Sequence, residues 1–465
     1  MNGEVTIMPY NSFDDYPMSW RPKLDRSERA LYLTLARTLE DDIASGALKP
    51  GTRLPPQREL ADFLDVNVST VAKAFKLCEL KGLLSATVGS GTFVAYSALT
   101  DKRFLERAEG THVIDMGSVQ PEDSANAALL DMARSLFRSD EAAALFSFHA
   151  QGEDEWQKDA AVTFMRLCGH EAHREQILFA NGAQNAISAV FASLFRRGEK
   201  IAVDDHTYPG VKSAAAMFGV KLVPVRSGEQ GMEPADLERL CRSEKIHGVY
   251  LISACHNPTT ATLPEDRRRE IAAVLRAYGA LLIEDGTNQL MQRGVPSVSS
   301  FAPERSIYIA TMSKVIAPGL RAACAAVPDA CKEAVAGALY SLNVGVVPMM
   351  AELAARVIAS GQFERIVAAH RRHTGERSRL VRAFLPDEIC RGGDADIFRW
   401  LTLPERFTSV QFEQAALARG VRVAAAERFA VGKTLPARAV RVAFCTPPRD
   451  QLEKGLSVLA ELIAD

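Results

Sequence analysis

Apolar residues recur at helical spacing in the first part of the chain. After a polar leader, they stand at every fourth position of one stretch: Leu31, Leu35, Leu39 and Ile43. This spacing predicts one amphipathic helix. Two shorter helices are predicted over residues 56–66 and 67–82, each with its own apolar side. Three short helices of this kind predict a small bundle at the start of the chain.

The bundle is followed by two short runs of strand-forming residues within 83–96, separated by Gly89-Ser90-Gly91. Glycines permit the backbone angles of a tight turn, so these runs predict a hairpin. Two helices joined by a tight turn, with a hairpin behind them, form a winged helix-turn-helix, which we place in residues 1–96. Residues 97–112 are polar and weakly patterned, and we predict a linker there.

From about residue 113 the pattern changes, because short buried strands now alternate with helical stretches. Strands are predicted over 200–205, 220–225, 248–254, 280–286 and 306–312, and crossover helices over 183–195 and 265–279. This alternation is typical of a doubly wound α/β domain with a mostly parallel sheet. From about residue 335, long helices and a few short strands predict a smaller α+β subdomain. One large domain therefore spans 113–465.

Composition restricts the class of protein but does not indicate a function. The chain has 465 residues, 47% of them hydrophobic, and a net charge of −2, which describes a soluble globular protein with no strong charge preference. Its eight cysteines are scattered, so neither a disulfide framework nor a metal site is indicated. The sequence offers neither a membrane span nor a signal peptide, and we expect a cytoplasmic protein.

The third predicted helix has polar groups at its start that suit DNA recognition. Asn67, Ser69, Thr70 and Lys73 would face DNA, while Arg53, Arg58 and the wing residue Ser90 would bind phosphates. By pattern alone a protein-binding bundle is an equal alternative, since three-helix bundles of both kinds share this periodicity.

The loops after the predicted strands of the large domain carry a second set of candidate residues. In chain order they are a glycine turn entering a helix, an aromatic ring, an amide, a carboxylate, and a lysine with hydroxyls and an arginine: Gly182, Ala183, Gln184, Tyr208, Asn257, Asp285, Thr311, Ser313, Lys314 and Arg321. Ligands of such sheets bind at the carboxyl ends of the strands. Pyridoxal 5′-phosphate requires this combination, since its aldehyde reacts with a lysine, its ring nitrogen pairs with an aspartate, and its phosphate binds amides, hydroxyls and an arginine.

The N-terminal sequence, which includes "LPPQRELADFLDVNVSTVAKAF", resembles the winged helix-turn-helix of GntR-type bacterial regulators over about sixty residues. The resemblance implies a dimer that binds a double-stranded operator with repeated half-sites, and it gives Arg58 a base and phosphate contact. Where many members have arginines in the recognition helix, this chain has Val68 and Ala72. Its operator preference is therefore expected to rely more on thymine methyls than on guanine edges.

Residues 113–465 resemble fold-type I, aspartate-aminotransferase-like enzymes, which depend on pyridoxal 5′-phosphate. The resemblance implies that Lys314 forms the aldimine, Asp285 pairs with the pyridine nitrogen, Asn257 donates to the 3′-oxygen and Tyr208 stacks on the ring. Ser313, Arg321 and the Gly182 turn would bind phosphate, and Arg441 would bind a substrate carboxylate.

The chain departs from the family in two places. Thr287 stands shortly after Asp285, where a tyrosine that contacts the 3′-oxygen is usual. Thr260 replaces the usual glycine after Asn257-Pro258-Thr259. The shorter threonine hydroxyl leaves the electronic tuning of the site open.

The two halves in this order resemble the MocR subfamily of bacterial regulators. The resemblance implies a transcription factor that senses pyridoxal 5′-phosphate, or a small amino compound that reacts with it, and that dimerises with the reader domains exchanged. One alternative is an active aminotransferase with an appended DNA-binding domain, since Asp285 and Lys314 are the minimum that proton transfer requires. Another is a sensor that has lost the cofactor.

Overall fold

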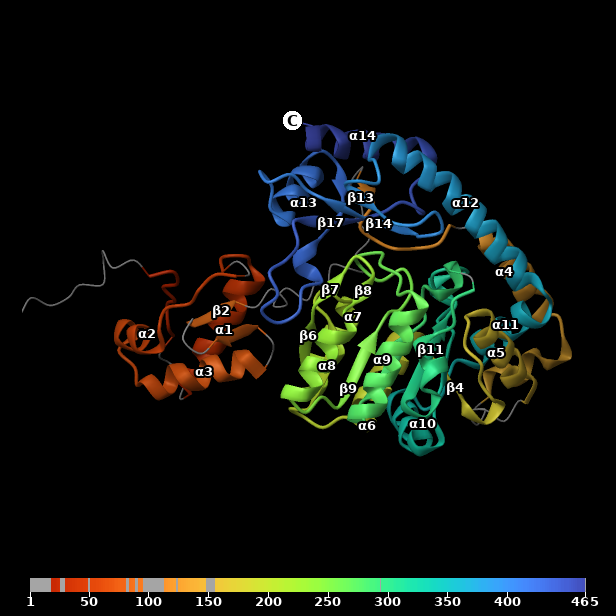
Figure 1. Cartoon of the computed structure of the whole chain (residues 1–465), viewed down its shortest axis with the longest axis horizontal. Helices are drawn as coiled ribbons and strands as arrows, with labels where there is room; N and C mark the ends of the chain where they lie inside the picture. Colours follow the sequence, from red (N-terminus) through yellow and green to blue (C-terminus); the bar gives the residue numbers. More distant parts are fainter. Residues whose placement is uncertain are drawn as a thin grey trace, which may run out of the picture. The chain divides into compact units, whose positions relative to one another are not determined.

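The computed structural model describes residues 18–25, 30–48, 51–80, 83–87, 91–94, 113–122, 124–147, 155–292 and 294–464. The chain divides into two compact units, Met1–Leu99 and Thr100–Asp465, which we call the reader unit and the body unit (Figure 1). The predicted linker at 97–112 lies outside the described residues, and its boundaries stay predictions.

The described part of the reader unit consists of helices and one hairpin. These are α1 (Leu31–Ala44), α2 (Gln57–Leu64), α3 (Val68–Leu80), β1 (Leu84–Thr87) and β2 (Gly91–Val94). The two strands pair antiparallel, with Leu84 opposite Val94. Leu35, Leu39 and Ile43 of the apolar stripe of α1 are buried in the core that α1 shares with α3, as their spacing predicts, whereas Leu31 is half-buried. The predicted helices and hairpin are therefore confirmed.

The segment before α1 contributes to the same core. Trp20 is only 5% exposed and packs in the cluster that holds Leu35 and Phe75. Its indole Nε1 donates to Asp42 Oδ2 on α1 at 2.7 Å. The sequence pattern predicts only a polar leader here, which is wrong for Trp20, because one large aromatic residue carries no periodicity to reveal its burial.

A seven-stranded sheet forms the centre of the body unit, in the order β4-β12-β11-β10-β9-β5-β6. Its strands are β4 (Ile177–Ala180), β5 (Lys200–Asp204), β6 (Lys221–Val225), β9 (Gly248–Leu251), β10 (Leu281–Asp285), β11 (Ser306–Thr311) and β12 (Ala323–Ala326). Only β12 runs antiparallel to its neighbours. The predicted mostly parallel sheet is confirmed, and β12 is an addition that the pattern did not reveal.

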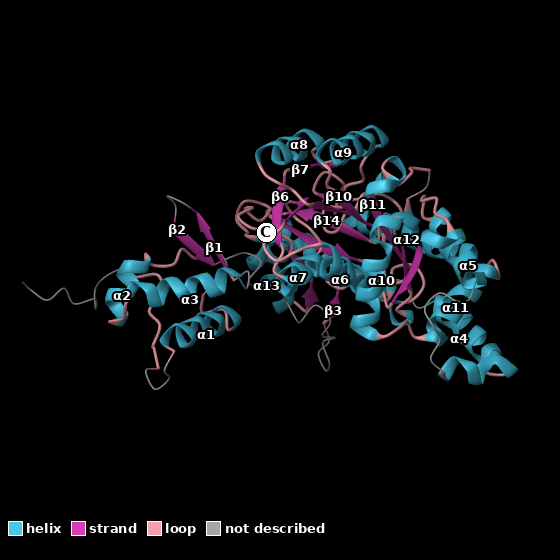
Figure 2. Ribbon diagram, turned by 90° about the horizontal axis from the view of Figure 1, so that it is seen from below, coloured by secondary structure: helices cyan, strands magenta, loops and turns pink. Residues whose placement is uncertain are grey.

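Helices cover both faces of this sheet (Figure 2). One face packs against α6 (Ala183–Leu194), α7 (Pro209–Phe218) and α10 (Asp329–Asn343). The other packs against α8 (Pro234–Ser243) and α9 (Glu265–Tyr278), with the short hairpin of β7 (Ser227–Gly228) and β8 (Gly231–Met232) at the edge. Both faces are buried, which explains the nearly continuous apolar runs of the central strands.

A smaller sheet, in the order β13-β14-β17-β16, belongs to the C-terminal part of the body unit. Its strands are β13 (Cys390–Arg391), β14 (Phe398–Thr402), β16 (Ala424–Ala425) and β17 (Ala439–Ala443). α13 (Ser409–Ala418) and α14 (Arg449–Ala464) pack beside this sheet, and α12 (Gln362–Phe384) contacts α14. α11 (Pro348–Ala359) packs against both α4 (Ser124–Leu136) and α5 (Glu155–Leu167), and α5 contacts β4 of the large sheet. Between α11 and α12, Gly361 adopts φ +69, which ends the first helix.

The first described residues of the body unit join this small sheet region. β3 (Ile114–Asp115) pairs parallel with β15 (Val421–Arg422). The backbone N–H of Ala443 on β17 also donates to the Met116 carbonyl at 2.7 Å. The chain that follows the predicted linker is therefore anchored beside β17, the strand that carries Arg441.

A buried carboxylate fixes β10 next to the candidate site. Glu284 is fully buried and accepts hydrogen bonds from the backbone N–H groups of Val298 and Ser299, at 3.0 and 2.7 Å. Hydroxyls of Ser253 and Ser299 also donate to it, at 2.5 and 2.6 Å. A buried charge needs such compensation, so this network holds the residue that precedes Asp285 in one position.

All eight cysteines lie among the described residues, and each is a free cysteine there. Within the described ranges, no helix combines the length and the apolar character that crossing a membrane requires.

Replacement of Trp20 by Ala should destabilise the reader unit by about 3–5 kcal/mol, because it removes a buried aromatic side chain and leaves a cavity. Hydrogen exchange of the α1–α3 amides in the full chain measures this change. The matched control is Trp156→Ala in the body unit, since Trp156 is 40% exposed. Equal reader stability in both variants would contradict the structural role of Trp20.

Candidate functional site

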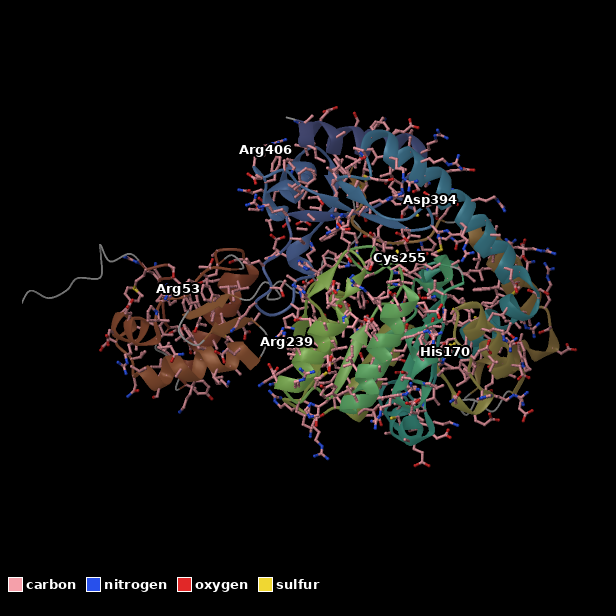
Figure 3. All side chains as sticks on the ribbon, viewed as in Figure 1. Arg53, His170, Arg239, Cys255, Asp394 and Arg406 are labelled. Atoms are coloured by element: carbon pink, nitrogen blue, oxygen red, sulfur yellow. The ribbon has the colours of Figure 1, made fainter. Side chains whose placement is uncertain are left out.

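The sequence-predicted residues of the large domain gather at the carboxyl edge of the seven-stranded sheet. Asp285 ends β10, Lys314 follows β11, and Tyr208 immediately precedes α7 in the connection after β5. Asn257 lies in the connection after β9, and Cys255, two residues before it, lies where the sheet approaches the small sheet region (Figure 3). Parallel strands bring their carboxyl ends to one edge, which is why residues distant in sequence meet here.

Lys314 extends from the turn after β11 into this edge. Its Nζ donates a hydrogen bond to the Val119 carbonyl at 2.7 Å. Burial lowers the pKa of Lys314 to about 8; the positive charges of Arg441 and Arg321 act in the same direction, and the negative charge of Asp285 opposes them. Lys314 therefore has a larger neutral, nucleophilic fraction near neutral pH than an ordinary lysine.

Asp285 is 5% exposed and accepts several hydrogen bonds. Tyr250 Oη donates to Oδ2 at 2.8 Å, and Thr287 donates to Oδ1 through its backbone N–H at 3.1 Å and also through its hydroxyl. Burial raises the pKa of Asp285, against the opposing effects of these hydrogen bonds and of Lys314. The hydroxyl of Thr287 is thus directed at the carboxylate, where it orients Asp285.

Glycine is required directly after Asp285. A Cβ atom at Gly286 would lie 2.2 Å from Tyr308 Oη, closer than any real contact. Tyr308 in turn donates to the Cys168 carbonyl at 3.0 Å and stacks on His170 with 4.5 Å between ring centroids. The backbone at Asp285 is therefore packed against a fixed aromatic pair.

A candidate anion site lies between the start of α6 and the loop after β11, and we call it the cradle; it consists of Gly182, Arg321 and the first amides of α6. Gly182 has φ +90, and a Cβ atom there would lie 2.1 Å from Arg321 Nη2. Arg321 donates to the Asn181 carbonyl at 3.2 Å and keeps an exposed side chain. The first amides of α6, at Ala183 and Gln184, have no acceptor within the helix, and helix N-termini attract anions.

Two hydroxyls line the adjacent turn. Thr311 Oγ1 and Ser313 Oγ lie 2.9 Å apart, and Thr311 also donates to the Ala322 carbonyl at 2.9 Å, next to Arg321. Both side chains are buried. The guanidinium, the helix start and this hydroxyl pair are the donors that a phosphate group prefers.

Tyr208 lies against a tight turn that sequence analysis did not single out. A Cβ atom at Gly210 would come within 2.2 Å of both Tyr208 Cε1 and Gln184 Oε1. Gln184 Nε2 donates to the Gly210 carbonyl at 2.9 Å. Burial raises the pKa of Tyr208 to about 12, and the charge of Asp285 adds to this effect, so the ring stays neutral. The side chain of Gln184 therefore holds the Tyr208 turn, while its backbone N–H belongs to the first turn of α6.

Arg441 is 1% exposed and brings the small sheet region to the site. Its Nη1 donates to Asn257 Oδ1 at 2.6 Å and its Nη2 to the Gly117 carbonyl at 2.7 Å. The guanidinium carbon lies 5.0 Å from the ring centroid of Phe429. Burial lowers the pKa of Arg441 to about 9, and Arg428 nearby acts in the same direction.

The carbonyls of Gly117 and Val119 are site groups that sequence analysis missed. Both belong to residues 113–122, the first described segment of the body unit. A backbone carbonyl has no side-chain signature, so no sequence pattern marks it. Tyr250, buried on β9, was missed because it looks like an ordinary core aromatic residue.

The turn after Asn257 keeps the backbone conformation that suits a glycine. Thr260 has φ +64, and its backbone N–H donates to the His256 carbonyl at 2.7 Å. A β-branched residue in this region carries strain of about 1–3 kcal/mol. The turn therefore holds Thr260 in a left-handed backbone conformation that glycine adopts without this strain.

The predicted DNA-contacting residues lie in the reader unit. Arg53, Arg58, Ser69 and Lys73 are exposed, and Thr70 is half-buried. Figure 3 labels Arg53, whose Nε would lie 3.0 Å from a Cβ atom at Gly91, so its side chain lies along the start of β2. Asn67 uses Oδ1 to accept from the Ser69 backbone N–H at 2.9 Å, which makes it a cap of α3. Ser90 lies outside the described residues.

Comparison with known proteins agrees with this arrangement. The aminotransferase class I and II family matches residues 111–459, and the family of bacterial regulatory proteins named gntR matches residues 31–94. The chain resembles the uncharacterized HTH-type transcriptional regulator YdeF of Bacillus subtilis (strain 168), with 48% identity over 460 residues, 98% of this chain and 100% of that protein. It is 26% identical over 427 residues to the probable rhizopine catabolism regulatory protein MocR of Rhizobium meliloti, covering 83% of this chain and 82% of that one.

Solved structures share the fold of the body unit. An archaeal alanine:glyoxylate aminotransferase superimposes with a TM-score of 0.70 at 19% identity, over 77% of this chain and 92% of that one. LysN, an alpha-aminoadipate aminotransferase from Thermus thermophilus, gives 0.69 at 19% identity, over 76% and 92%. This chain therefore belongs to the aminotransferase class I and II family and, with its GntR domain, is an HTH-type transcriptional regulator of the MocR subfamily.

Proposed function

We propose that this regulator binds pyridoxal 5′-phosphate through Lys314 and changes its fit to operator DNA in response to the cofactor or to a small amino compound. The observation that carries the proposal is the joint burial of Lys314 and Asp285 at the sheet edge, beside the anion cradle of Gly182 and Arg321. Each group matches one chemical part of that cofactor.

The donor set fits the cofactor part by part. Gly182, Ser313, Arg321 and the first amides of α6 would hold the phosphate, Tyr208 would cover one ring face, and Asp285 would pair with the ring nitrogen. Bound there, the cofactor would supply an aldehyde that reacts reversibly with amines. The pKa of Asp285 is raised by burial, yet three hydrogen-bond donations from Tyr250 and Thr287 favour its ionised form, which a protonated ring nitrogen needs.

Arg441 is the candidate for an effector carboxylate. Its buried guanidinium lies at the site, where Nη1 donates to Asn257 Oδ1 and Nη2 to the Gly117 carbonyl, and a planar guanidinium can bind a carboxylate through two parallel hydrogen bonds. The burial that lowers the pKa of Arg441 to about 9 makes an approaching carboxylate more favourable still. We therefore expect an amino acid or a related amino carboxylate as the effector.

Residues 113–122, which we call the strap, provide a route from this site toward the reader unit. The strap carbonyls of Val119 and Gly117 accept from Lys314 and Arg441, the two side chains that would engage cofactor and effector. Reaction at the Lys314 amine removes a donor from Val119, and a carboxylate at Arg441 competes with Gly117. The strap follows directly on the predicted linker, so a change in its position reaches the chain that leads to the reader.

We also propose that the body unit forms a homodimer through the surface beside the cradle. Apolar side chains exposed there surround a loop that hydrogen-bonds Asn181 and Asn185: Tyr340, Leu342, Val344 and Val347. A cluster of this kind is typical of an interface with a second chain. Exchange of the reader domains across the dimer remains part of this proposal.

Lys314→Ala should abolish the visible absorbance band that appears when the protein is mixed with pyridoxal 5′-phosphate, whereas Lys221→Ala, which alters an exposed lysine, should not. Only the neutral amine reacts, so in the unsubstituted protein the rate of band formation should rise with pH through about 8 and then level off. A band of equal intensity in Lys314→Ala would contradict the proposal. Turnover of amino acids above roughly 1 s⁻¹ would favour the aminotransferase alternative.

Addition of pyridoxal 5′-phosphate should speed hydrogen exchange at the strap amides of Gly117 and Ser118, which now donate to Asp115 Oδ1 at 3.0 and 3.1 Å. The reason is the loss of the bond between Lys314 and Val119. In Lys314→Ala the exchange should already be fast and should not respond to the cofactor. Cofactor binding without a change in strap exchange in the unsubstituted protein would rule out this route.

Arg58→Ala should weaken operator binding by about 5- to 100-fold and leave the cofactor band unchanged, because it removes one phosphate or base contact from the exposed face of the reader. Fluorescence anisotropy with a promoter fragment measures the affinity. Arg37→Ala, an exposed arginine on α1, is the matched control for the loss of charge. If both variants bind like the unsubstituted protein, α2 and α3 do not contact the operator as proposed.

A further inference from the structure

The start of α3 presents an apolar side chain where a DNA-reading helix meets base edges. Val68 is the first residue of α3 and is 39% exposed, which makes it the one exposed large apolar residue among the described reader side chains. Its neighbours on both sides, Asn67 and Ser69, are exposed polar residues. The N-terminal residues of a recognition helix are those that reach the bases in the major groove.

The core does not account for this valine. The buried stripe of α3 consists of Val71, Ala74, Phe75 and Cys78, all at most 1% exposed. Val68 lies one turn before that stripe and at its edge, where 39% of its surface stays exposed. Ala72, four residues on and half-buried, continues this edge along the helix. Val68 and Ala72 together form an apolar strip, which borders the face of α3 that points away from the core.

The outward face beside the strip is basic and polar. Ser69, Lys73 and Lys76 are exposed there, and Arg58 is exposed on α2. Lysines and an arginine can hold phosphates on either side of the groove, while the strip faces the space between them. Asn67 caps the helix through Oδ1, so the backbone at Val68 is fixed by a local hydrogen bond of 2.9 Å to Ser69.

We propose that Val68, supported by Ala72, contacts the 5-methyl group of a thymine in each operator half-site. This inference rests on the proposed operator binding and specifies what is read there. Val and Ala side chains neither donate nor accept hydrogen bonds, so they cannot distinguish bases by polar edges. In the major groove, thymine alone among the four DNA bases offers a methyl group, and apolar side chains are its partners.

The contribution of this contact to the binding free energy can be estimated. Burial of one methyl group between the base and the valine contributes about 0.8 kcal/mol, which corresponds to about a fourfold change in affinity. A dimer that makes the contact in two half-sites loses about 16-fold when both methyls are absent, if the sites are independent.

The experiment replaces thymine by deoxyuridine, which lacks only the methyl group. A bound operator is first selected from random duplexes with the full-length protein, and each thymine is then replaced in turn, with affinity measured by fluorescence anisotropy at fixed salt. One position per half-site should lose about fourfold in affinity. Deoxyuridine outside the half-sites, which should have no effect, is the control.

The Val68→Ala variant is then tested on both operators, the one with thymine and the one with deoxyuridine. It should weaken binding to the thymine operator by a similar factor and should no longer distinguish thymine from deoxyuridine at that position. Leu417→Ala, which removes an exposed apolar side chain of the body unit, should keep the full distinction.

The outcomes separate this inference from the proposed function. If an operator is selected and no deoxyuridine position matters, or if Val68→Ala keeps the same sensitivity, the methyl contact is wrong and operator binding stands. If no sequence is enriched and no duplex binds, the proposed operator binding itself fails, and this inference fails with it.

Discussion

The site depends on one constraint: charged side chains are buried close together at the carboxyl edge of the seven-stranded sheet. Lys314, Arg441 and Asp285 are desolvated together, and Arg321 contributes a further positive charge to the field at Lys314. Burial, helped by the excess of positive charge, lowers the pKa of Lys314, and burial raises that of Asp285. Neutral backbone carbonyls of the strap accept hydrogen bonds from Lys314 and Arg441. Under the proposed function, an anionic phosphate would lie beside Arg321 and a carboxylate beside Arg441.

Three glycines allow the charged and aromatic groups of the site to lie this close to the backbone. Gly182, Gly210 and Gly286 each leave room for a neighbouring functional group: the Arg321 guanidinium, the Tyr208 ring and the Tyr308 hydroxyl. At Gly286 the overlap would be with the buried Tyr308 ring, which has no free space to move into. At Gly182 the overlap would be with the end of the exposed Arg321 side chain, and the backbone angle φ +90 is the stronger reason for glycine there. Behind the site, the hydrogen-bonded Glu284 keeps β10 in register. The site is thus built from close backbone approach as much as from its polar side chains.

The architecture links two kinds of recognition through one covalent chain. In the body unit, the strap lies against β15 and β17 and contacts both candidate ligand-binding cations. In the reader unit, polar and basic groups of α2 and α3 are exposed together with the apolar edge at Val68. Linkage requires that a ligand bind two states of the body unit with different affinity, and under the proposed function the contacts of the strap carbonyls would differ between those states.

The sequence by itself determined the order of the units, the helices of the reader, the alternation that makes the sheet mostly parallel, and the side chains that line its carboxyl edge. It could do so because hydrophobic periodicity and the topology of parallel strands are local or repeating properties. Only the tertiary structure decided that Thr287 supports Asp285, that Gln184 holds the Tyr208 turn, that Trp20 belongs to the reader core, and that Gly117 and Val119 contact the two cations. These contacts join residues through backbone carbonyls, glycine clearances and single side chains without periodicity, so they exist only once distant segments have packed together.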